Sequence, residues 1–179
     1  MIQKLENLVR VGEAGKLAGL RRGVNKPPGL VPEAYAQVAA CLEPGTPAWK
    51  EEAAYHLATL FAWWHQGRDR LAYRPPPNMG ASFRLLAEKP AGSAEGEGRS
   101  ESVERRFTAV LKARLEALPH HLRHAVGLLN AHDVAVDWRN LLQDLWDWRH
   151  PDLPVQRRWS RSFWAPEKSR PEACDQMHS

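Results

Sequence analysis

The sequence predicts an all-α protein made of two small helical bundles packed together, with about eight or nine helices. Strand signals are almost absent, because isoleucine occurs only as Ile2 and β-branched residues never alternate with polar ones over a useful window. Apolar residues instead recur with the period of a helix along most of the chain. The 179 residues are 43% hydrophobic and 26% charged, which is typical of a globular chain that buries its own core.

The first half of the chain is expected to begin with three helices. The first covers residues 5–20 and can break near Gly12–Gly15, and Gly23 lies just past its end as a candidate cap. The next two cover residues 32–42 and 47–65, and each starts with a proline at a position that helices tolerate.

Proline and glycine mark the interruptions of this pattern. Residues 68–78 include three consecutive prolines and cannot be helical, and a short helix is expected after them around residues 82–88. Residues 91–100 are small, polar, Gly-rich and acidic, which predicts a linker. The predicted organisation is an N-terminal bundle over residues 1–90, the linker over residues 91–100, a C-terminal bundle over residues 101–165 and a frayed tail over residues 166–179.

The C-terminal bundle is expected to contain helices over residues 101–118, 119–130, 138–148 and 154–164. Ser100 and Asp137 are candidate N-caps for the first and third of these helices. Arg114 projects into the middle of the apolar face of the first helix, where an unpaired guanidinium would be costly. We therefore expect Arg114 to pair with Asp144 or Asp137, or to extend its head group to the surface.

The tryptophans of the helix over residues 138–148 coincide with its leucines. Trp138, Trp146 and Trp148 fall on the same arc of the helix as the leucine side chains. We interpret them as core residues rather than as a platform on which bases stack.

The helix over residues 154–164 divides into an apolar side and a basic side. The apolar side consists of Val155, Trp159 and Phe163, and the basic side of Arg157, Arg158 and Arg161. Arginine presents a planar fork that matches phosphate oxygens, so the basic side is a candidate for phosphate binding. The alternative is a solvated helix end whose cations interact favourably with the helix dipole.

Composition narrows the class of protein. Lys and Arg total 25 against 21 acidic residues, for a net charge of +4, and 18 of the 25 are arginine. No apolar run approaches the roughly 20 residues of a membrane span, and the first residues lack the apolar core of a secretion signal. Cys41 and Cys174 form no CxxC motif and indicate a reducing compartment. We therefore expect a cytoplasmic protein without a membrane partner.

Motifs for catalysis or metal binding find little support. His120 and His124 share one helix face, but no cysteine or carboxylate cluster offers the further ligands that zinc needs. The doublet His132-Asp133 is like that of HD-type phosphohydrolases, which need more metal ligands, and an aspartate before a turn also suits a capping role. GxxxxGK[ST], GxGxxG and GxSxG are absent. We expect no enzyme activity, no metal and no cofactor.

Four stretches of the sequence carry a resemblance to one known family. They are Gly19–Gly23, Met79–Leu86, Glu104–Phe107 with Leu111 and continuing to Leu122–His124, and Asp137–Trp148 followed by Val155–Trp164. In their order and spacing over about residues 15–165 they resemble the CasB family, the small subunit of the type I-E CRISPR surveillance complex Cascade.

The resemblance implies a non-enzymatic, all-α subunit that is present with a second copy of itself among other Cascade subunits. It implies sequence-independent backbone contacts with CRISPR RNA and target DNA, including the displaced strand, which would stabilise the R-loop in antiviral defence. The nucleic-acid-binding residues that it implies are Arg21, Arg22, Arg84, Arg105, Arg106, Arg123, Arg157, Arg158 and Arg161.

Two other classes of function stay open. A helical protein–protein adaptor could use the same arginines on acidic partner surfaces and have no nucleic-acid affinity of its own. A metal-dependent phosphohydrolase could be built on His132-Asp133.

Overall fold

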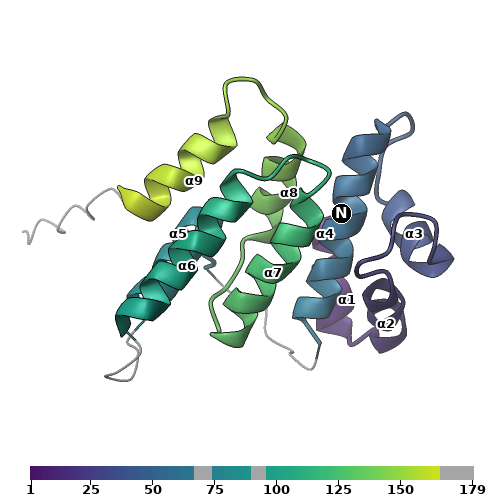
Figure 1. Cartoon of the computed structure of the whole chain (residues 1–179). Coiled ribbons are helices and arrows are strands. Elements are labelled where there is room, and N and C mark those ends of the chain that lie inside the picture. Colours follow the sequence, from purple (N-terminus) through teal and green to yellow (C-terminus); the bar gives the residue numbers. More distant parts are fainter. Residues whose placement is uncertain (67–73, 90–95, 166–179) are drawn as a thin grey trace, which may run out of the picture.

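The computed structural model describes residues 1–66, 74–89 and 96–165, and it confirms the all-α class (Figure 1). These ranges contain no strand, and their nine helices are α1 (Ile2–Val11), α2 (Ala14–Arg22), α3 (Pro32–Ala39), α4 (Ala48–Trp64), α5 (Met79–Glu88), α6 (Gly96–Leu111), α7 (Leu118–Ala131), α8 (Trp138–Asp147) and α9 (Pro154–Trp164). Among the described helices, none is long and apolar enough to cross a membrane.

Two predicted helix ends have clear physical causes. The break near Gly12–Gly15 is confirmed, because Gly12 adopts a left-handed φ of 72° and its N–H bonds to the last carbonyls of α1. Asp137 caps α8 as predicted, since its carboxylate accepts hydrogen bonds from the backbone N–H groups of Arg139 and Asn140.

The helix expected over residues 101–118 is wrong at both ends. α6 begins at Gly96, so Ser100 lies inside the helix and is not its N-cap. α6 ends at Leu111, so Arg114 lies in the turn before α7, where its side chain is exposed. Asp144 pairs with a different arginine, Arg158. The apolar period continues through the turn because Leu115 packs partly against the core, and pattern alone therefore extends the helix too far.

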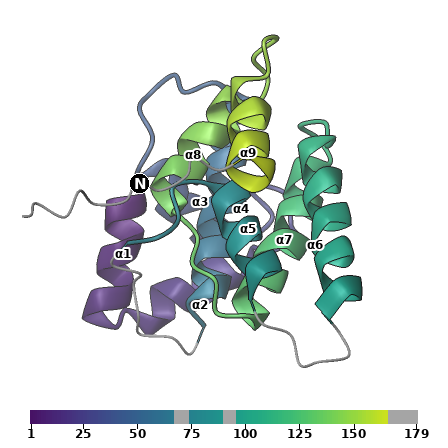
Figure 2. The same ribbon diagram turned by 90° about the vertical axis from the view of Figure 1, so that its left-hand side faces the viewer.

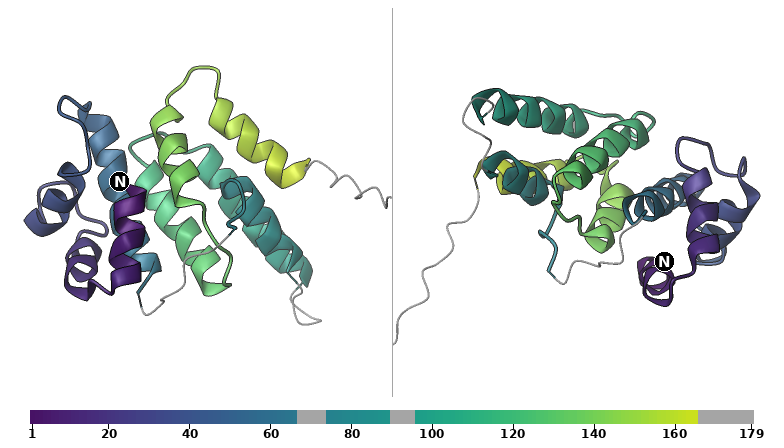
Figure 3. Two further views of the ribbon diagram at one scale, coloured as in Figure 1. Left: turned by 180° about the vertical axis from the view of Figure 1, so that it is seen from behind. Right: turned by 90° about the horizontal axis from the view of Figure 1, so that it is seen from below.

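The core is one hydrophobic cluster that runs from Ile2 in α1 to Trp159 in α9. α4 is central to it and contacts α1, α2, α3, α7 and α8. Views from the side, behind and below place α1, α2 and α3 at the end of the molecule opposite α5, α6 and α9 (Figures 2 and 3). The predicted linker over residues 91–100 is helical from Gly96 onward, where α6 begins, and its earlier residues lie outside the described residues, as do residues 67–73 and 166–179. The division into two bundles stays a prediction.

α5 packs against α9 and α6. Gly80 of α5 lies against the backbone of α9, and a Cβ added there would overlap the backbone carbonyl of Trp159. Only glycine permits this crossing, which seats α9 on the core and fixes the direction of its outer side.

The core assignment of the α8 tryptophans is confirmed. Trp138 and Trp148 are buried, and Trp146 packs partly against the core. In α9, Trp159 is 0% exposed, whereas Trp164 exposes 48% of its surface. Trp164 therefore stands apart from the tryptophans that build the core.

Candidate nucleic-acid interface

The three arginines on the basic side of α9 differ in their surroundings. Arg158 pairs with a buried carboxylate of the fold, whereas Arg157 and Arg161 do not. Asp144 of α8 is 2% exposed, and one of its oxygens accepts a hydrogen bond from Trp159 Nε1 at 2.7 Å. The other oxygen pairs with the guanidinium of Arg158. Arg158 thus neutralises a buried carboxylate, which is a structural task that the sequence did not reveal.

Burial, with a smaller contribution from the negative charge of Asp147, raises the pKa of Asp144 despite the opposing effects of the Trp159 hydrogen bond and the Arg158 charge. The carboxylate is therefore costly to keep ionised even with both partners in place. Asp144 and Arg158 hold α8 to α9, which fixes the orientation of the outer side of α9.

Arg157 and Arg161 are one turn apart on that outer side and are exposed. Their direction follows from the burial of Val155 and Trp159 on the opposite side of the helix. Within the described residues, no acidic side chain forms an ion pair with either guanidinium. Both are available to an anion from solvent.

A second group of cations gathers where α6 meets α7. Arg106 precedes the buried Phe107 in α6, and Arg123 follows the buried Leu122 in α7, so both flank the contact between these helices. His124 is exposed, but partial desolvation by neighbouring side chains lowers its pKa, and the positive charges of its neighbours on both helices lower it further. Those neighbours are His120, Arg106, Arg123 and His121.

This second group also lacks acidic partners. No ion pair between Arg106 or Arg123 and a carboxylate exists in the part of the chain that the structure describes. The rings of His120 and His124 lie 4.6 Å apart between centroids, which adds two titratable groups to the cluster. We call Arg106 and Arg123 at the α6–α7 contact and Arg157 and Arg161 on α9 together the basic surface, which thus consists of two groups on different helices.

The remaining predicted arginines lie elsewhere or have partners. Arg105 is exposed on α6 beside the basic surface. Arg84 pairs with Glu88 of its own helix at 3.3 Å, and Arg22 of α2 pairs with Glu33 at 3.9 Å. Arg21 is half-buried on α2, at the end of the molecule away from α9 (Figure 1).

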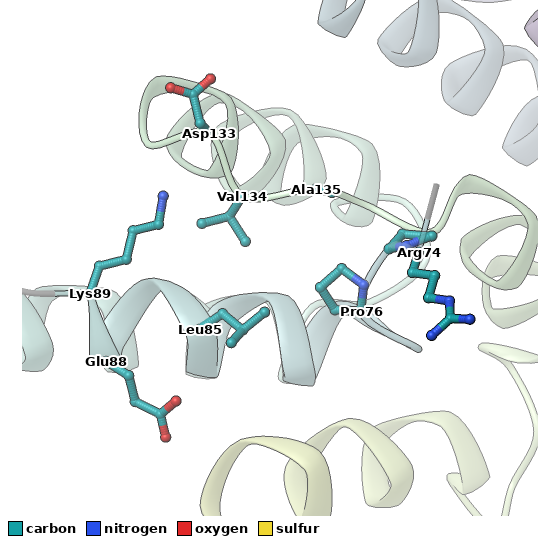
Figure 4. Close-up of a pocket in the computed structure, with 9 residues that line it drawn as sticks. Arg74, Pro76, Leu85, Glu88, Lys89, Asp133, Val134 and Ala135 are labelled. Atoms are coloured by element: carbon teal, nitrogen blue, oxygen red, sulfur yellow. The ribbon is translucent and has the colours of Figure 1, made fainter. Parts of the chain in front are cut away.

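A cavity of about 550 Å³ lies beside the His132-Asp133 doublet, between α5 and the chain that follows α7 (Figure 4). Its walls include Leu85, Val134, Arg74, Glu88, Lys89 and Asp133. Lys89 donates a hydrogen bond to the carbonyl of His132, and Asp133 has a left-handed φ of 52°. Across the described residues, no three His, Cys, Asp or Glu side chains are placed to hold a metal ion. Both signs of charge line this cavity, unlike the basic surface.

Sequence reasoning missed two contributions to the candidate interface. His120 and His124 are exposed, as expected for surface histidines, and the structure adds that they lie in the α6–α7 cation cluster. The core interpretation of the tryptophans over residues 138–148 does not extend to Trp164, which lies three residues after Arg161 on the same side of α9. The spacing of Arg157, Arg161 and Trp164 contains that signal.

The fold and the surface define an all-α protein with an arginine-rich exposed region. The chain belongs to the CRISPR-associated Cse2 family, also called CasB, whose family model matches residues 16–164. The resemblance inferred from the sequence is therefore confirmed at the level of the family.

Known relatives agree with this assignment. A CRISPR-associated protein Cse2 of Thermus thermophilus is 35% identical over 161 residues, covering 87% of this chain and 82% of the relative. A chain of a CRISPR RNA-guided surveillance complex has a TM-score of 0.72 and 28% identity, covering 90% of this chain and 88% of that chain. The crystal structure of a CasB protein from Thermus thermophilus has a TM-score of 0.68 and 28% identity, covering 90% of this chain and 96% of that chain.

Proposed function

We propose that this chain is a non-catalytic subunit of a CRISPR RNA-guided surveillance complex, Cascade, in which it binds nucleic-acid backbones. Its family and its likeness to a chain of such a complex support the assignment to the complex. The observation that carries the binding role is that the four arginines of the basic surface have no acidic partners within the described residues. Guanidinium groups at the surface without such partners are suited to phosphate oxygens.

The proposed ligands are the target DNA strand and the displaced strand, held beside the CRISPR RNA. Contacts to phosphates position a strand without identifying its bases, so binding would be independent of sequence and would stabilise the R-loop in the cytoplasm. Arg105 extends the basic surface on α6, while Arg21, Arg22 and Arg84 would meet other parts of the nucleic acid. Other Cascade subunits and a second copy of this chain complete the proposed partners.

The affinity of the full chain for labelled single- and double-stranded DNA and RNA tests this proposal. At about 50 mM salt, where phosphate contacts are strong, we expect binding to unrelated sequences with similar affinity. Arg157→Ala with Arg161→Ala should weaken binding roughly tenfold, and Arg158 is left in place because it neutralises Asp144.

A charge-matched control is Arg10→Ala with Lys26→Ala, two exposed cations at the other end of the molecule. This variant should bind almost as the natural chain does. Equal losses in both double variants would contradict a localised surface. Absence of binding to every nucleic acid would contradict the proposal and favour a protein–protein adaptor.

A further inference from the structure

The outer side of α9 carries an aromatic ring in line with Arg157 and Arg161, which have no acidic partners among the described residues. Arg157, Arg161 and Trp164 are spaced by four and three residues, which places them within about 60° of one another around the helix. They extend over roughly 10 Å along its axis, and all are exposed. In Figure 2, no other helix lies in front of α9.

Trp164 is held in a defined orientation although it is exposed. Its Nε1 donates a hydrogen bond to Glu104 Oε1 of α6 at 3.1 Å. Its ring centroid lies 5.0 Å from that of Phe163 and 5.4 Å from that of Phe107, so two aromatic side chains support it. Even with these contacts, 48% of the residue stays accessible to solvent.

An anchored and accessible indole beside Arg157 and Arg161, neither of which pairs with a described acidic side chain, matches one class of ligand best. Single-stranded nucleic acid supplies both the anionic backbone for the guanidinium groups and planar bases for the ring, and proteins that bind it combine these two contacts. An apolar protein surface would satisfy the ring but would leave both arginines without counter-charges. Charge complementarity therefore favours a nucleic-acid strand as the occupant.

We propose that Trp164 stacks on a base of a single strand whose phosphates are bound by Arg157 and Arg161. This proposal rests on the proposed function, because it adds a base contact to a strand already held by its backbone. The carboxylate of Glu104 accepts a hydrogen bond from the N–H edge of the ring, and its negative charge would repel phosphates at that edge. The phosphates are therefore expected beside the arginines, with the base over the ring of Trp164. Since every base has a stacking face, the contact needs no sequence preference.

The test compares two single-stranded oligonucleotides of equal length and charge, one of thymidines and one with abasic spacers in place of all bases. The full natural chain should bind the thymidine strand roughly fivefold more tightly than the abasic strand, which is the scale of one stacked base. Trp164→Ala should abolish this difference, and Trp164→Phe should retain part of it. Leu85→Ala, which removes another exposed apolar side chain, should leave it unchanged.

The outcomes separate this proposal from the proposed function. If the natural chain binds both strands equally well, Trp164 does not stack and the backbone-binding role stands. If Trp164→Ala keeps its thermal stability and also keeps the preference for thymidine, another residue stacks and the assignment is overturned. If neither strand binds, both proposals fail, and competition by an acidic peptide would then identify a protein partner instead.

Discussion

The inner and outer sides of α9 differ in burial and in the partners of their side chains. On its inner side, Trp159 is fully buried among contacts with α5 and α8. On its outer side, Arg157 and Arg161 face solvent without acidic partners among the described residues. Arg158 lies between them and is paired with the buried Asp144. Adjacent arginines on one helix thus have different roles. Mutations on the inner side should lower the free energy of unfolding, whereas mutations on the outer side should lower the affinity for nucleic acid.

The largest effect is expected in the inner region, where α5 crosses α9. Gly80→Ala would drive a methyl group into the backbone carbonyl of Trp159, and neither backbone can move without opening the core. We expect a loss of about 3 kcal/mol in the free energy of unfolding, measured by urea denaturation. Gly15→Ala is the control, because a Cβ at that position in α2 meets no atom within 4 Å. The control should gain about 0.5 kcal/mol, and similar losses in both variants would contradict the account.

Asp144→Ala should produce the second largest effect. It leaves the indole N–H of Trp159 without its acceptor and Arg158 without its counter-charge, for an expected loss of about 2 kcal/mol. Asp144→Asn keeps an acceptor oxygen and removes the cost of a buried charge, so it should lose less than half as much. Equal losses in the two variants would contradict the prediction.

The pH dependence of the Asp144→Ala effect follows from the raised pKa of Asp144. A carboxyl group whose pKa is higher in the folded state contributes most to stability below its unfolded pKa, and this contribution falls as pH rises through the folded pKa. The stability gap between the natural chain and Asp144→Ala should therefore widen as the pH is lowered toward the unfolded pKa of about 4. If the stability difference between the two proteins instead decreases as the pH is lowered, the ion pair with Arg158 would outweigh the cost of burying the Asp144 carboxylate.

A smaller effect is expected for the pH dependence of nucleic-acid affinity, through His124 on the exposed surface. Partial desolvation and nearby cations lower the pKa of the exposed His124, so the free protein resists protonation there and loses stability as pH falls through the usual histidine range. A bound phosphate reverses this preference because it favours the imidazolium. Affinity for single-stranded DNA should therefore rise roughly threefold between about pH 7.5 and about pH 5.5, and less in His124→Ala. Affinity that is independent of pH in the natural chain would contradict the placement of a phosphate near His124.

The smallest effect is expected for an arginine that already has a partner. Arg139 of α8 pairs with Glu6 of α1 and is 60% exposed on its side chain. Arg139→Ala should lower the free energy of unfolding by about 0.5 kcal/mol and should leave nucleic-acid affinity nearly unchanged. A loss of affinity equal to that of an unpaired arginine would show that total charge, rather than pairing, determines binding.

The parts of this fold that could be predicted are those that local chemistry decides. The two sides of α9 follow from the spacing of apolar and basic residues, and the cap at Asp137 follows from its carboxylate before a helical pattern. The end of α6 at Leu111 could not be predicted, because apolar residues continue at a helical period through the turn and no glycine or proline interrupts them before Pro119.

Contacts between distant segments account for the rest. Arg158 and Asp144 belong to different helices, so their pairing exists only after α8 packs against α9. Gly80 in a helical segment has no local signature, since its role depends on the backbone of α9. The gathering of cations from α6 and α7 likewise exists only after the two helices pack together.

The salt dependence of single-stranded DNA binding tests the central claim most directly. The quantity is the slope of the logarithm of the association constant against the logarithm of salt concentration, for the natural chain and for a variant with all four arginines of the basic surface changed to alanine. We predict that the slope becomes shallower by about 3 in the variant, since each lost phosphate contact removes about 0.7. An unchanged slope would contradict the claim that the basic surface binds the nucleic-acid backbone.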